Sequence, residues 1–330
     1  MHNLDSINLL ENYVFDFIFK LLDEKKKKFL SKSRIIEITR LIYTIEIILR
    51  NLNENTYTTL RQIFYTNSQL FISQNVSNRI IGKITKIIKK PRELLNIYNS
   101  PKGIIRGNIL LKEKNLNHWV DCMNIFEIRG HLICPFGVSD IIINQNVKYV
   151  LLIEKETIFF KLLQSDFINK YGPSILITAK GFPDINTRQL IFEIHRRNKN
   201  LKFFCLTDYD AYGLNIAFTY SSKYESKVYY VDDISNDNLY WLILFTPDEA
   251  IKKNVLKKID LNNLSLKDIR ILDNICNNLK KKTNKCHAAE INRWIEYATN
   301  MKKDGVKYEI DSVINIEKHI NMKIKEFLLT

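Results

Sequence analysis

The chain has 330 residues, enough to bury a substantial core and to form two domains of ordinary size. It carries 50 Lys and Arg against 36 Asp and Glu, and this net charge of +14 favours a polyanionic partner such as nucleic acid. No apolar run reaches transmembrane length and the five cysteines lack the spacing of a disulfide framework, so we expect neither a membrane protein nor a secreted disulfide scaffold.

The first part of the chain has the apolar periodicity of helices. This pattern predicts helices at 9–22, 33–52, 58–71 and 76–89, with a solvated lysine-rich loop at 24–28. Residues 94–112 then predict two short strands around a turn at Asn99–Gly103. Three helices followed by a β-hairpin are the arrangement of a winged helix, a variant of helix-turn-helix.

The second part of the chain alternates strands and helices. Such alternation indicates an α/β domain with a mostly parallel, Rossmann-like sheet and helices on both faces, and a helical region follows it. We therefore expect a helical extension at 1–56, a winged-helix domain at 57–144 and an α/β domain at 145–330. The predicted strands are 147–153, 174–178, 202–206 and 226–231, and the predicted helices are 155–163, 185–196, 213–224, 266–282, 288–302 and 314–329.

Acidic residues end two of the predicted strands. Glu154 follows strand 147–153, and Asp208 and Asp210 follow strand 202–206, with Asp208 54 residues beyond Glu154. Because the carboxyl ends of parallel strands meet at one edge of a sheet, we expect the three carboxylates to converge. Hard oxygen ligands suit Mg²⁺, so the pattern predicts a magnesium site. Each carboxylate taken alone would more simply cap the helix that follows its strand.

The loop from Thr178 to Arg188 lies in the sequence between these two strand ends. Gly181 allows a close approach of the backbone to a ligand, and Asp184 is a suitable N-cap. Lys180 and Arg188 are candidate phosphate contacts, and plain surface charge is the alternative reading of both.

Arg61 and Tyr65 lie four residues apart on a predicted helix and therefore share one face. A tyrosine is a poor nucleophile at neutral pH, because the pKa of its hydroxyl is about 10. A guanidinium one turn away would stabilise both the phenolate and the negative charge of a phosphoryl transition state. The alternative is an ordinary core or surface tyrosine, since the chain has 16 of them.

Basic residues concentrate in one part of the chain. Residues 61–115 contain eleven basic and two acidic residues, a local excess of nine positive charges. On the predicted helix at 76–89 the basic residues form one face beside an apolar stripe, and more follow in the predicted hairpin. This is the pattern of a duplex-DNA surface, with a solvated helix face as the alternative. The candidate DNA contacts here are Arg79, Lys83, Lys86, Lys90, Lys102 and Arg106.

Four motifs together resemble a known family. The segment 61–71, RQIFYTNSQLF, resembles the catalytic tyrosine motif of the A-type component of topoisomerase VI and of its eukaryotic relative, the meiotic transesterase of the Spo-eleven type. The segments 153–156, 177–188 and 208–213 resemble the Toprim motifs of that family, in the same order and spacing. The similarity runs from about Tyr57 to the C-terminal helices.

The resemblance implies a fold and a reaction. The fold would be a catabolite-activator-like winged-helix domain followed by a Toprim domain. Tyr65 would attack double-stranded DNA with help from Arg61, and Glu154, Asp208 and Asp210 would hold Mg²⁺. The tyrosine of one subunit of a homodimer would reach the metal site of the other, so that two such sites break both strands and leave tyrosine linked to the 5′ ends.

The resemblance also implies a cellular setting. The protein would act with a topoisomerase VI B-like partner on chromosomes in the nucleus, where its breaks initiate meiotic recombination. Three other functions stay open at this point. A type IIB topoisomerase subunit would reseal the DNA with an ATPase partner, a hydrolytic Toprim nuclease or primase would not need Tyr65, and a degenerate relative would only bind DNA or scaffold a complex.

Overall fold

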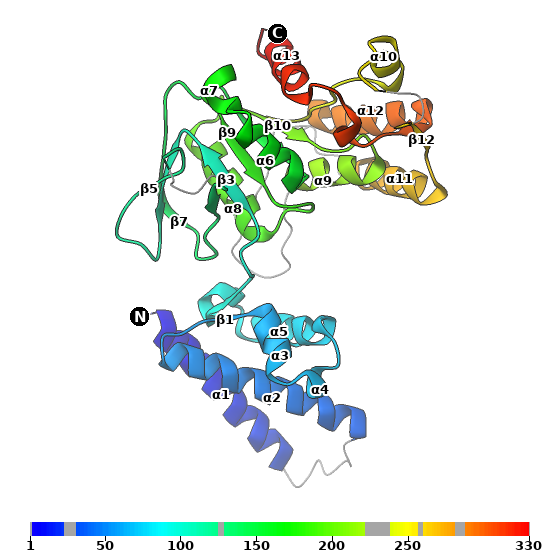
Figure 1. The fold of residues 1–330 in the computed structure, drawn as a ribbon. Helices are drawn as coiled ribbons and strands as arrows, with labels where there is room; N and C mark the ends of the chain where they lie inside the picture. The colour runs from blue at the N-terminus through cyan, green and yellow to red at the C-terminus, as the bar shows by residue number, and fades with distance from the viewer. Residues whose placement is uncertain are drawn as a thin grey trace. The chain divides into compact units, whose positions relative to one another are not determined.

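The computed structural model describes residues 2–22, 31–124, 129–221, 238–256, 260–280 and 288–329. These residues form two compact units that meet in the sequence between Ser100 and Pro101. We call them unit 1 and unit 2 and describe each by itself (Figure 1). The lysine-rich loop at 24–28 and the predicted strand 226–231 lie outside the described residues.

Unit 1 is built from helices and one small pair of strands. The predicted helices at 9–22, 33–52 and 76–89 are confirmed, whereas the predicted helix 58–71 is divided at Asn67. The backbone of Asn67 is not helical, and its side-chain oxygen accepts a hydrogen bond of 3.0 Å from the backbone N–H three residues on, which starts a new helix. The helices are α1 (His2–Leu22), α2 (Lys32–Asn53), α3 (Leu60–Thr66), α4 (Ser68–Phe71), α5 (Gln74–Ile88) and a 3₁₀ turn (Arg92–Leu95).

The core of unit 1 lies where α5 packs on α2. Ile80, Ile84 and Ile88 of α5 are buried, as the apolar stripe in the sequence predicts. They belong to one core cluster with Ile45 and Ile48 of α2. Burial of each such side chain stabilises the fold by about 1.5–3 kcal/mol, so tertiary packing holds these helices more than helix propensity does.

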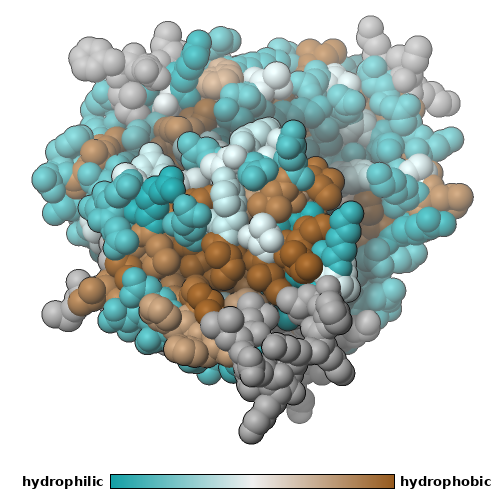
Figure 2. Space-filling model, turned by 90° about the horizontal axis from the view of Figure 1, so that it is seen from below, coloured by the Kyte–Doolittle hydropathy of each residue, from teal (hydrophilic) through white to brown (hydrophobic). Residues whose placement is uncertain are grey.

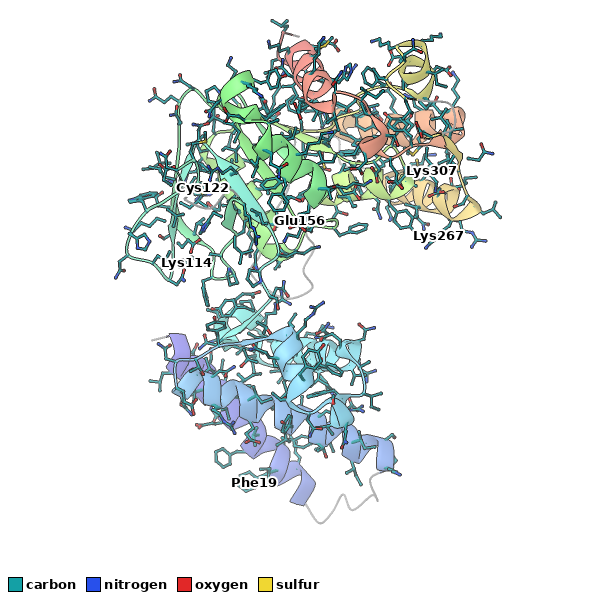
Figure 3. All side chains as sticks on the ribbon, in the orientation of Figure 1. Phe19, Lys114, Cys122, Glu156, Lys267 and Lys307 are labelled. Atoms are coloured by element: carbon teal, nitrogen blue, oxygen red, sulfur yellow. The ribbon has the colours of Figure 1, made fainter. Side chains whose placement is uncertain are left out.

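One face of α1 is apolar and exposed. The exposed large apolar side chains on this face are Leu4, Phe15, Ile18 and Phe19. Figure 2 shows apolar side chains gathered on the face that α1 and α2 present, and Figure 3 shows Phe19 projecting outward from α1. A group of this kind on one helix marks a contact surface, whereas a single exposed apolar residue needs no explanation. None of the described helices is both long enough and apolar enough to span a bilayer.

A six-stranded sheet forms the centre of unit 2. Its order is β11-β10-β8-β9-β3-β6, in which the first four strands are parallel and the last two are each antiparallel to their neighbour. All five residues of β8 are buried, as expected for a parallel strand covered on both faces. The strands are β3 (Ile104–Gly107), β6 (His131–Leu132), β8 (Tyr149–Ile153), β9 (Ile175–Thr178), β10 (Lys202–Leu206) and β11 (Leu239–Trp241).

Helices flank this sheet and continue into a helical C-terminal region, as the sequence predicts. In Figure 1 α6, α8 and α9 lie along the sheet, and α11 and α12 pack together beside α9. The helices of unit 2 are α6 (Glu156–Gln164), α7 (Phe167–Tyr171), α8 (Ile185–Arg197), α9 (Ala211–Ser221), α10 (Pro247–Lys252), α11 (Leu266–Lys280), α12 (Ala288–Asp304), α13 (Ile316–Leu329) and a 3₁₀ turn (Ile310–Ser312).

The described residues of unit 2 also form two smaller sheets. An antiparallel sheet has the order β5-β4-β7, and an antiparallel pair joins β12 to β13. Their strands are β4 (Ile109–Glu113), β5 (Val120–Asp121), β7 (Val138–Ile143), β12 (Asn262–Asn263) and β13 (Val306–Lys307).

The predicted hairpin at 94–112 is wrong. Its first strand, β2 (Ile97–Tyr98), pairs in parallel with β1 (Thr58–Thr59) in unit 1. Its second strand, β3, pairs instead with β9 in unit 2, where Ile104 and Ile105 are buried. The apolar strand gains more by joining a sheet core than by forming an isolated hairpin, which is marginal in water. The segment 57–144 is therefore shared between the two units and does not form the single domain expected.

Candidate active site

Glu154 and Asp208 meet at the carboxyl edge of the sheet of unit 2. Their strands β8 and β10 are parallel neighbours, and Ile153 stands opposite Leu206. The backbone N–H of Glu154 donates to Leu206 O at 3.0 Å, and the backbone N–H of Asp208 donates to Glu154 Oε2 at 3.1 Å. The strand pairing thus brings two acidic residues from distant parts of the sequence into direct contact.

Asp210 lies at the start of α9 and caps it. Its Oδ1 atom accepts a hydrogen bond of 2.6 Å from the backbone N–H of Gly213. A Cβ atom on Gly213 would lie 2.2 Å from the carbonyl oxygen of Asp208, so only glycine lets the turn close at this point. Asp210 therefore caps a helix, which is the simpler of the two roles predicted for an acidic residue after a strand. The side chains of Glu154 and Asp208 accept other hydrogen bonds and do not cap a helix.

A C-terminal segment that the sequence did not indicate holds the Asp208–Asp210 turn. We call residues 304–311 the strap. Tyr308 of the strap exchanges two backbone hydrogen bonds with Tyr209, at 3.0 and 3.2 Å, and Ile310 N donates to Asp208 Oδ1 at 2.9 Å. The ring of Tyr209 stacks on those of Trp241 and Tyr308, with centroid distances of 5.5 and 5.2 Å. These contacts fix the turn that carries the two aspartates.

Lys155, next to the first acidic residue, is the principal cation of the site. Its Nζ atom lies 3.0 Å from Asp208 Oδ2, 3.1 Å from Glu309 Oε2 and 2.6 Å from Asp311 Oδ2. Burial lowers the pKa of Lys155, but the bonds to Asp311 and Asp208 outweigh it and hold the pKa above its ordinary value. A positive residue directly after Glu154 was the signal in the sequence that could have found this contact.

Burial is the main influence on the ionisation of the acidic residues. Burial, with the neighbouring charge of Asp208, raises the pKa of Glu154 to about 7. Burial also raises the pKa of Asp208 and of Asp210, although Lys155 and Lys307 respectively oppose the shift. A buried acidic group in this state is stabilised by a bound cation.

The donor set suits Mg²⁺ in its chemistry. All three candidate ligands offer hard carboxylate oxygens, and the charges of Asp208 and Asp210 add to the effect of burial on the pKa of Glu154. Within the described residues, no three or more His, Cys, Asp or Glu side chains are placed closely enough to hold a metal ion. Coordination by Glu154, Asp208 and Asp210 together would therefore need side-chain movement from the positions described.

The loop between β9 and α8 lies at the same edge. The backbone N–H of Gly181 donates to Glu154 O at 3.0 Å, with Gly181 in the left-handed region at φ +96°. Asp184 caps α8 as the sequence predicts, since its Oδ1 accepts from Thr187 N at 2.7 Å. Lys180 ion-pairs with Glu156 at 2.9 Å at the edge shown in Figure 3.

Three other predicted DNA or phosphate contacts in unit 2 are engaged or at least half-buried. Lys102 Nζ donates to Phe182 O at 2.9 Å, and burial lowers the pKa of its ammonium. The side chain of Arg188 is 6% exposed, which is not the placement expected of a surface phosphate contact. Arg106 is half-buried on β3.

Unit 1 holds the second group of candidate residues, on α3. Thr59 and Gln62 form a reciprocal capping box, with bonds of 3.2 and 2.7 Å, that starts this short helix. Arg61 and Tyr65 are both exposed one turn apart, and the Tyr65 side chain is 69% exposed. The ring of Phe64 packs against the core and lies 5.1 Å from the Tyr65 ring. The structure thus presents the tyrosine hydroxyl to solvent from a capped helix.

The predicted basic face of α5 divides into two kinds of residue. Arg79 and Lys86 are exposed. Lys83 ion-pairs with Glu37 of α2 at 2.7 Å, and Lys90, just beyond α5, ion-pairs with Asp5 of α1. Lys83 and Lys90 therefore help to hold the helices of unit 1 together, whereas Arg79 and Lys86 are available to an anionic partner.

Comparison with known proteins identifies similar sequences for both parts of the chain. Residues 149–329 match the family model for the Toprim domain shared by Spo11 and the A-type component of topoisomerase 6, and residues 36–97 match the one described as Type IIB DNA topoisomerase. The human Meiotic recombination protein SPO11 is 30% identical over 266 residues, which cover 78% of this chain and 62% of the human protein.

Two further relatives carry similar names. The mouse Meiotic recombination protein SPO11 is 28% identical, with 78% of this chain and 62% of the mouse protein covered. Meiotic recombination protein SPO11-1 of Arabidopsis thaliana is 28% identical, with 84% of this chain and 73% of the plant protein covered. The chain thus spans a little under two thirds of the length of the mammalian proteins it matches.

The raised pKa of Glu154 predicts how stability depends on pH. A carboxyl whose pKa is higher in the folded than in the unfolded state stabilises the fold at low pH, and this stability is lost as the pH rises from about 4.5 to about 7. Between pH 5 and 8, without metal, we expect the free energy of unfolding to fall by on the order of 1–3 kcal/mol more than in a Glu154→Gln variant.

Urea denaturation at a series of pH values, with a chelator present, measures this difference. Glu156→Gln, which changes a carboxylate at the same edge, is the matched control and should follow the unmodified protein. Parallel stability curves for the unmodified protein and Glu154→Gln would show that Glu154 ionises freely in the fold.

Proposed function

Because the chain belongs to the family of Spo11 and the A-type component of topoisomerase 6, we propose that it cleaves double-stranded DNA by transesterification and so initiates meiotic recombination. Two features of one chain carry this proposal: an exposed tyrosine one turn from an arginine on a capped helix, and an acidic pair at the edge of a Toprim sheet. A hydrolytic nuclease needs the second feature but has no use for the first.

We propose Tyr65 as the nucleophile. Its hydroxyl oxygen forms a bond to a DNA phosphorus while the bond from phosphorus to the 3′ oxygen breaks. The phenol proton passes to solvent and the 3′ oxygen takes one up, so the product is a 5′-phosphotyrosyl link and a free 3′ hydroxyl. The number of phosphoester bonds is unchanged, and no hydrolysis is required.

Arg61 and the carboxylates of unit 2 have separate roles in this reaction. Arg61, one turn before Tyr65, stabilises the phenolate and the charge on the phosphoryl oxygens. Glu154, Asp208 and Asp210 would hold Mg²⁺, which supplies Lewis-acid stabilisation at the same phosphate. The reaction then needs Tyr65 and Arg61 of a unit 1 and the carboxylates of a unit 2 at the same phosphate.

We propose that the two halves of each active site come from different protomers of a homodimer. A homodimer has two tyrosines and two acidic sites, so two shared sites act on the two strands of one duplex. The resemblance to the family supports this arrangement, because it implies a homodimer with shared sites.

DNA binding in this proposal belongs mainly to unit 1, with α5 as the recognition helix of a helix-turn-helix type of domain; residues 94–112 do not supply the hairpin of a winged helix. Exposed Arg79 and Lys86 support it, and Lys180 of unit 2 is a further candidate. Lys102, Arg106 and Arg188 are weaker candidates, because each is buried or half-buried.

A topoisomerase VI B-like partner completes the proposal. The exposed apolar face of α1 supports a protein contact in this region. The names of the human, mouse and Arabidopsis relatives support meiotic break formation, and therefore action on chromosomes in the nucleus. The match of residues 36–97 to a type IIB topoisomerase model favours one alternative, an A-type topoisomerase component that also reseals the DNA.

Substitution of the proposed nucleophile tests the reaction class. Tyr65→Phe should reduce covalent protein–DNA adducts to background, because phenylalanine has no oxygen to attack phosphorus. Denaturing capture of the tagged protein from meiotic cells, followed by labelling of the attached 3′ ends, measures the adducts. Tyr57→Phe, at another exposed tyrosine of unit 1, is the control and should retain them; equal adducts from Tyr65→Phe would exclude transesterification by Tyr65.

Mixed dimers test the shared site. In a dimer of Tyr65→Phe with Asp208→Asn, a shared arrangement leaves one site with an intact tyrosine and an intact acidic set. We expect such dimers to nick one strand, whereas each variant alone should not cleave. If dimers that are shown to be mixed do not nick DNA, both halves of the site belong to one protomer.

The two exposed basic residues of α5 predict a change in salt dependence. Arg79→Ala with Lys86→Ala should reduce the slope of log K against log salt by about 2, one for each lost phosphate contact. Fluorescence anisotropy with a labelled duplex at several salt concentrations measures the slope. Arg50→Ala, an exposed arginine on α2, should leave the slope unchanged, and an equal effect from Arg50→Ala would indicate only the loss of bulk charge.

A further inference from the structure

Three carboxylates surround one ammonium group at the edge of the sheet. Lys155 Nζ contacts one oxygen each of Asp208, Glu309 and Asp311, at distances between 2.6 and 3.1 Å. Asp208 belongs to the proposed metal site, whereas Glu309 and Asp311 belong to the strap. Lys155 therefore joins two sets of acidic groups, of which only one has a proposed role in catalysis.

Both oxygens of Asp208 are already engaged by the protein. Oδ1 accepts from Ile310 N at 2.9 Å, and Oδ2 lies 3.0 Å from Lys155 Nζ. The contact with Ile310 comes from the backbone and is part of the fold of the strap. The contact with Lys155 comes from a flexible side chain with a single compact charge. A cation that approaches Asp208 Oδ2 therefore meets the positive charge of Lys155 at the same oxygen.

The strap provides Lys155 with carboxylate partners other than Asp208. The side chains of Glu309 and Asp311 are 72% and 45% exposed, whereas that of Asp208 is 14% exposed. The ammonium keeps two carboxylate partners when it leaves Asp208, so its release does not strand a buried charge. The side chain of Asp208 is much less exposed, so loss of the ammonium costs it more unless another cation takes that place.

We propose that Lys155 is a positioning residue that neutralises Asp208 in the metal-free protein and moves wholly onto Glu309 and Asp311 when a divalent cation binds. The ammonium holds the acidic pair in place before the metal arrives, and it competes with the metal for Asp208 Oδ2. The strap sets the strength of this competition. This inference rests on the proposed role of Asp208 as a metal ligand.

The first test is the affinity of the full chain for Mn²⁺ without DNA, measured from the electron paramagnetic resonance signal of the free ion. Lys155→Met should bind Mn²⁺ about three- to tenfold more tightly, because the competing charge is gone. Lys155→Arg keeps a charge and should stay within about twofold of the unmodified protein. Lys161→Met removes an exposed lysine of α6 that has no proposed role, and it should also stay within about twofold.

The second test concerns the strap. Asp311→Asn leaves Lys155 with fewer partners away from Asp208, so Mn²⁺ affinity should fall about threefold. In the double variant with Lys155→Met, the Asp311→Asn change should no longer lower the affinity, because the residue that transmits it is absent. If the charge of Asp311 acted only at long range, Asp311→Asn would lower the Mn²⁺ affinity equally with Lys155 and with Lys155→Met. That result would overturn the proposed coupling through Lys155.

The outcomes separate this inference from the metal site itself. Weaker or unchanged Mn²⁺ binding by Lys155→Met would overturn the competition, provided that Asp208→Asn weakens binding. Unchanged binding by Asp208→Asn would instead overturn the proposed metal site, and the inference with it. Thermal unfolding of each metal-free variant identifies any that fails to fold, and Lys155→Gln replaces Lys155→Met in both tests if that variant does not fold.

Discussion

The candidate site depends on the parallel pairing of β8 with β10. With Ile153 opposite Leu206, the next residues of the two strands carry Glu154 and Asp208 to the same point. Four of the five residues of β10 and all of β8 are buried, so a shift of one residue in register would carry a charged flanking residue, Lys148 or Glu154, into a buried position. The free energy of that core offsets the cost of placing two carboxylates side by side, and the site cannot be displaced without disturbing the sheet.

Charge balance is the constraint that shapes the surroundings of this pair. Each aspartate of the turn has a lysine within electrostatic reach, Lys155 for Asp208 and Lys307 for Asp210, and each lysine also contacts a further carboxylate. The strap supplies Lys307, Glu309 and Asp311, and its backbone pairs with Tyr209. The same segment therefore holds the turn mechanically and sets its electrostatics.

Unit 1 presents its candidate residues in the opposite way. Tyr65 is exposed on a helix whose position is set by buried Ile63 and by the capping box before it. The neighbouring Phe64 packs inward, so the two aromatic residues have different tasks: one anchors the helix and the other faces solvent. An exposed, rigidly presented hydroxyl suits a nucleophile that must reach a phosphate on a separate molecule, and the exposed apolar face of α1 leaves a separate surface for a protein partner.

The sequence alone determined the features that depend on local pattern. The helices of unit 1, the parallel strands of unit 2 and the cap at Asp184 all follow from periodicity and capping chemistry, and the four motifs indicated the family. The break at Asn67 and the pairing of β3 with β9 did not follow, because a local pattern does not say which distant edge a strand joins. The strap is the clearest case: nothing near Tyr308 or Asp311 in the sequence points to Asp208, about 100 residues earlier, and only tertiary packing brings them together. The sequence thus identified the candidate carboxylates, whereas only the tertiary structure showed that Lys155 pairs with one of them, because an ion pair depends on distance in space.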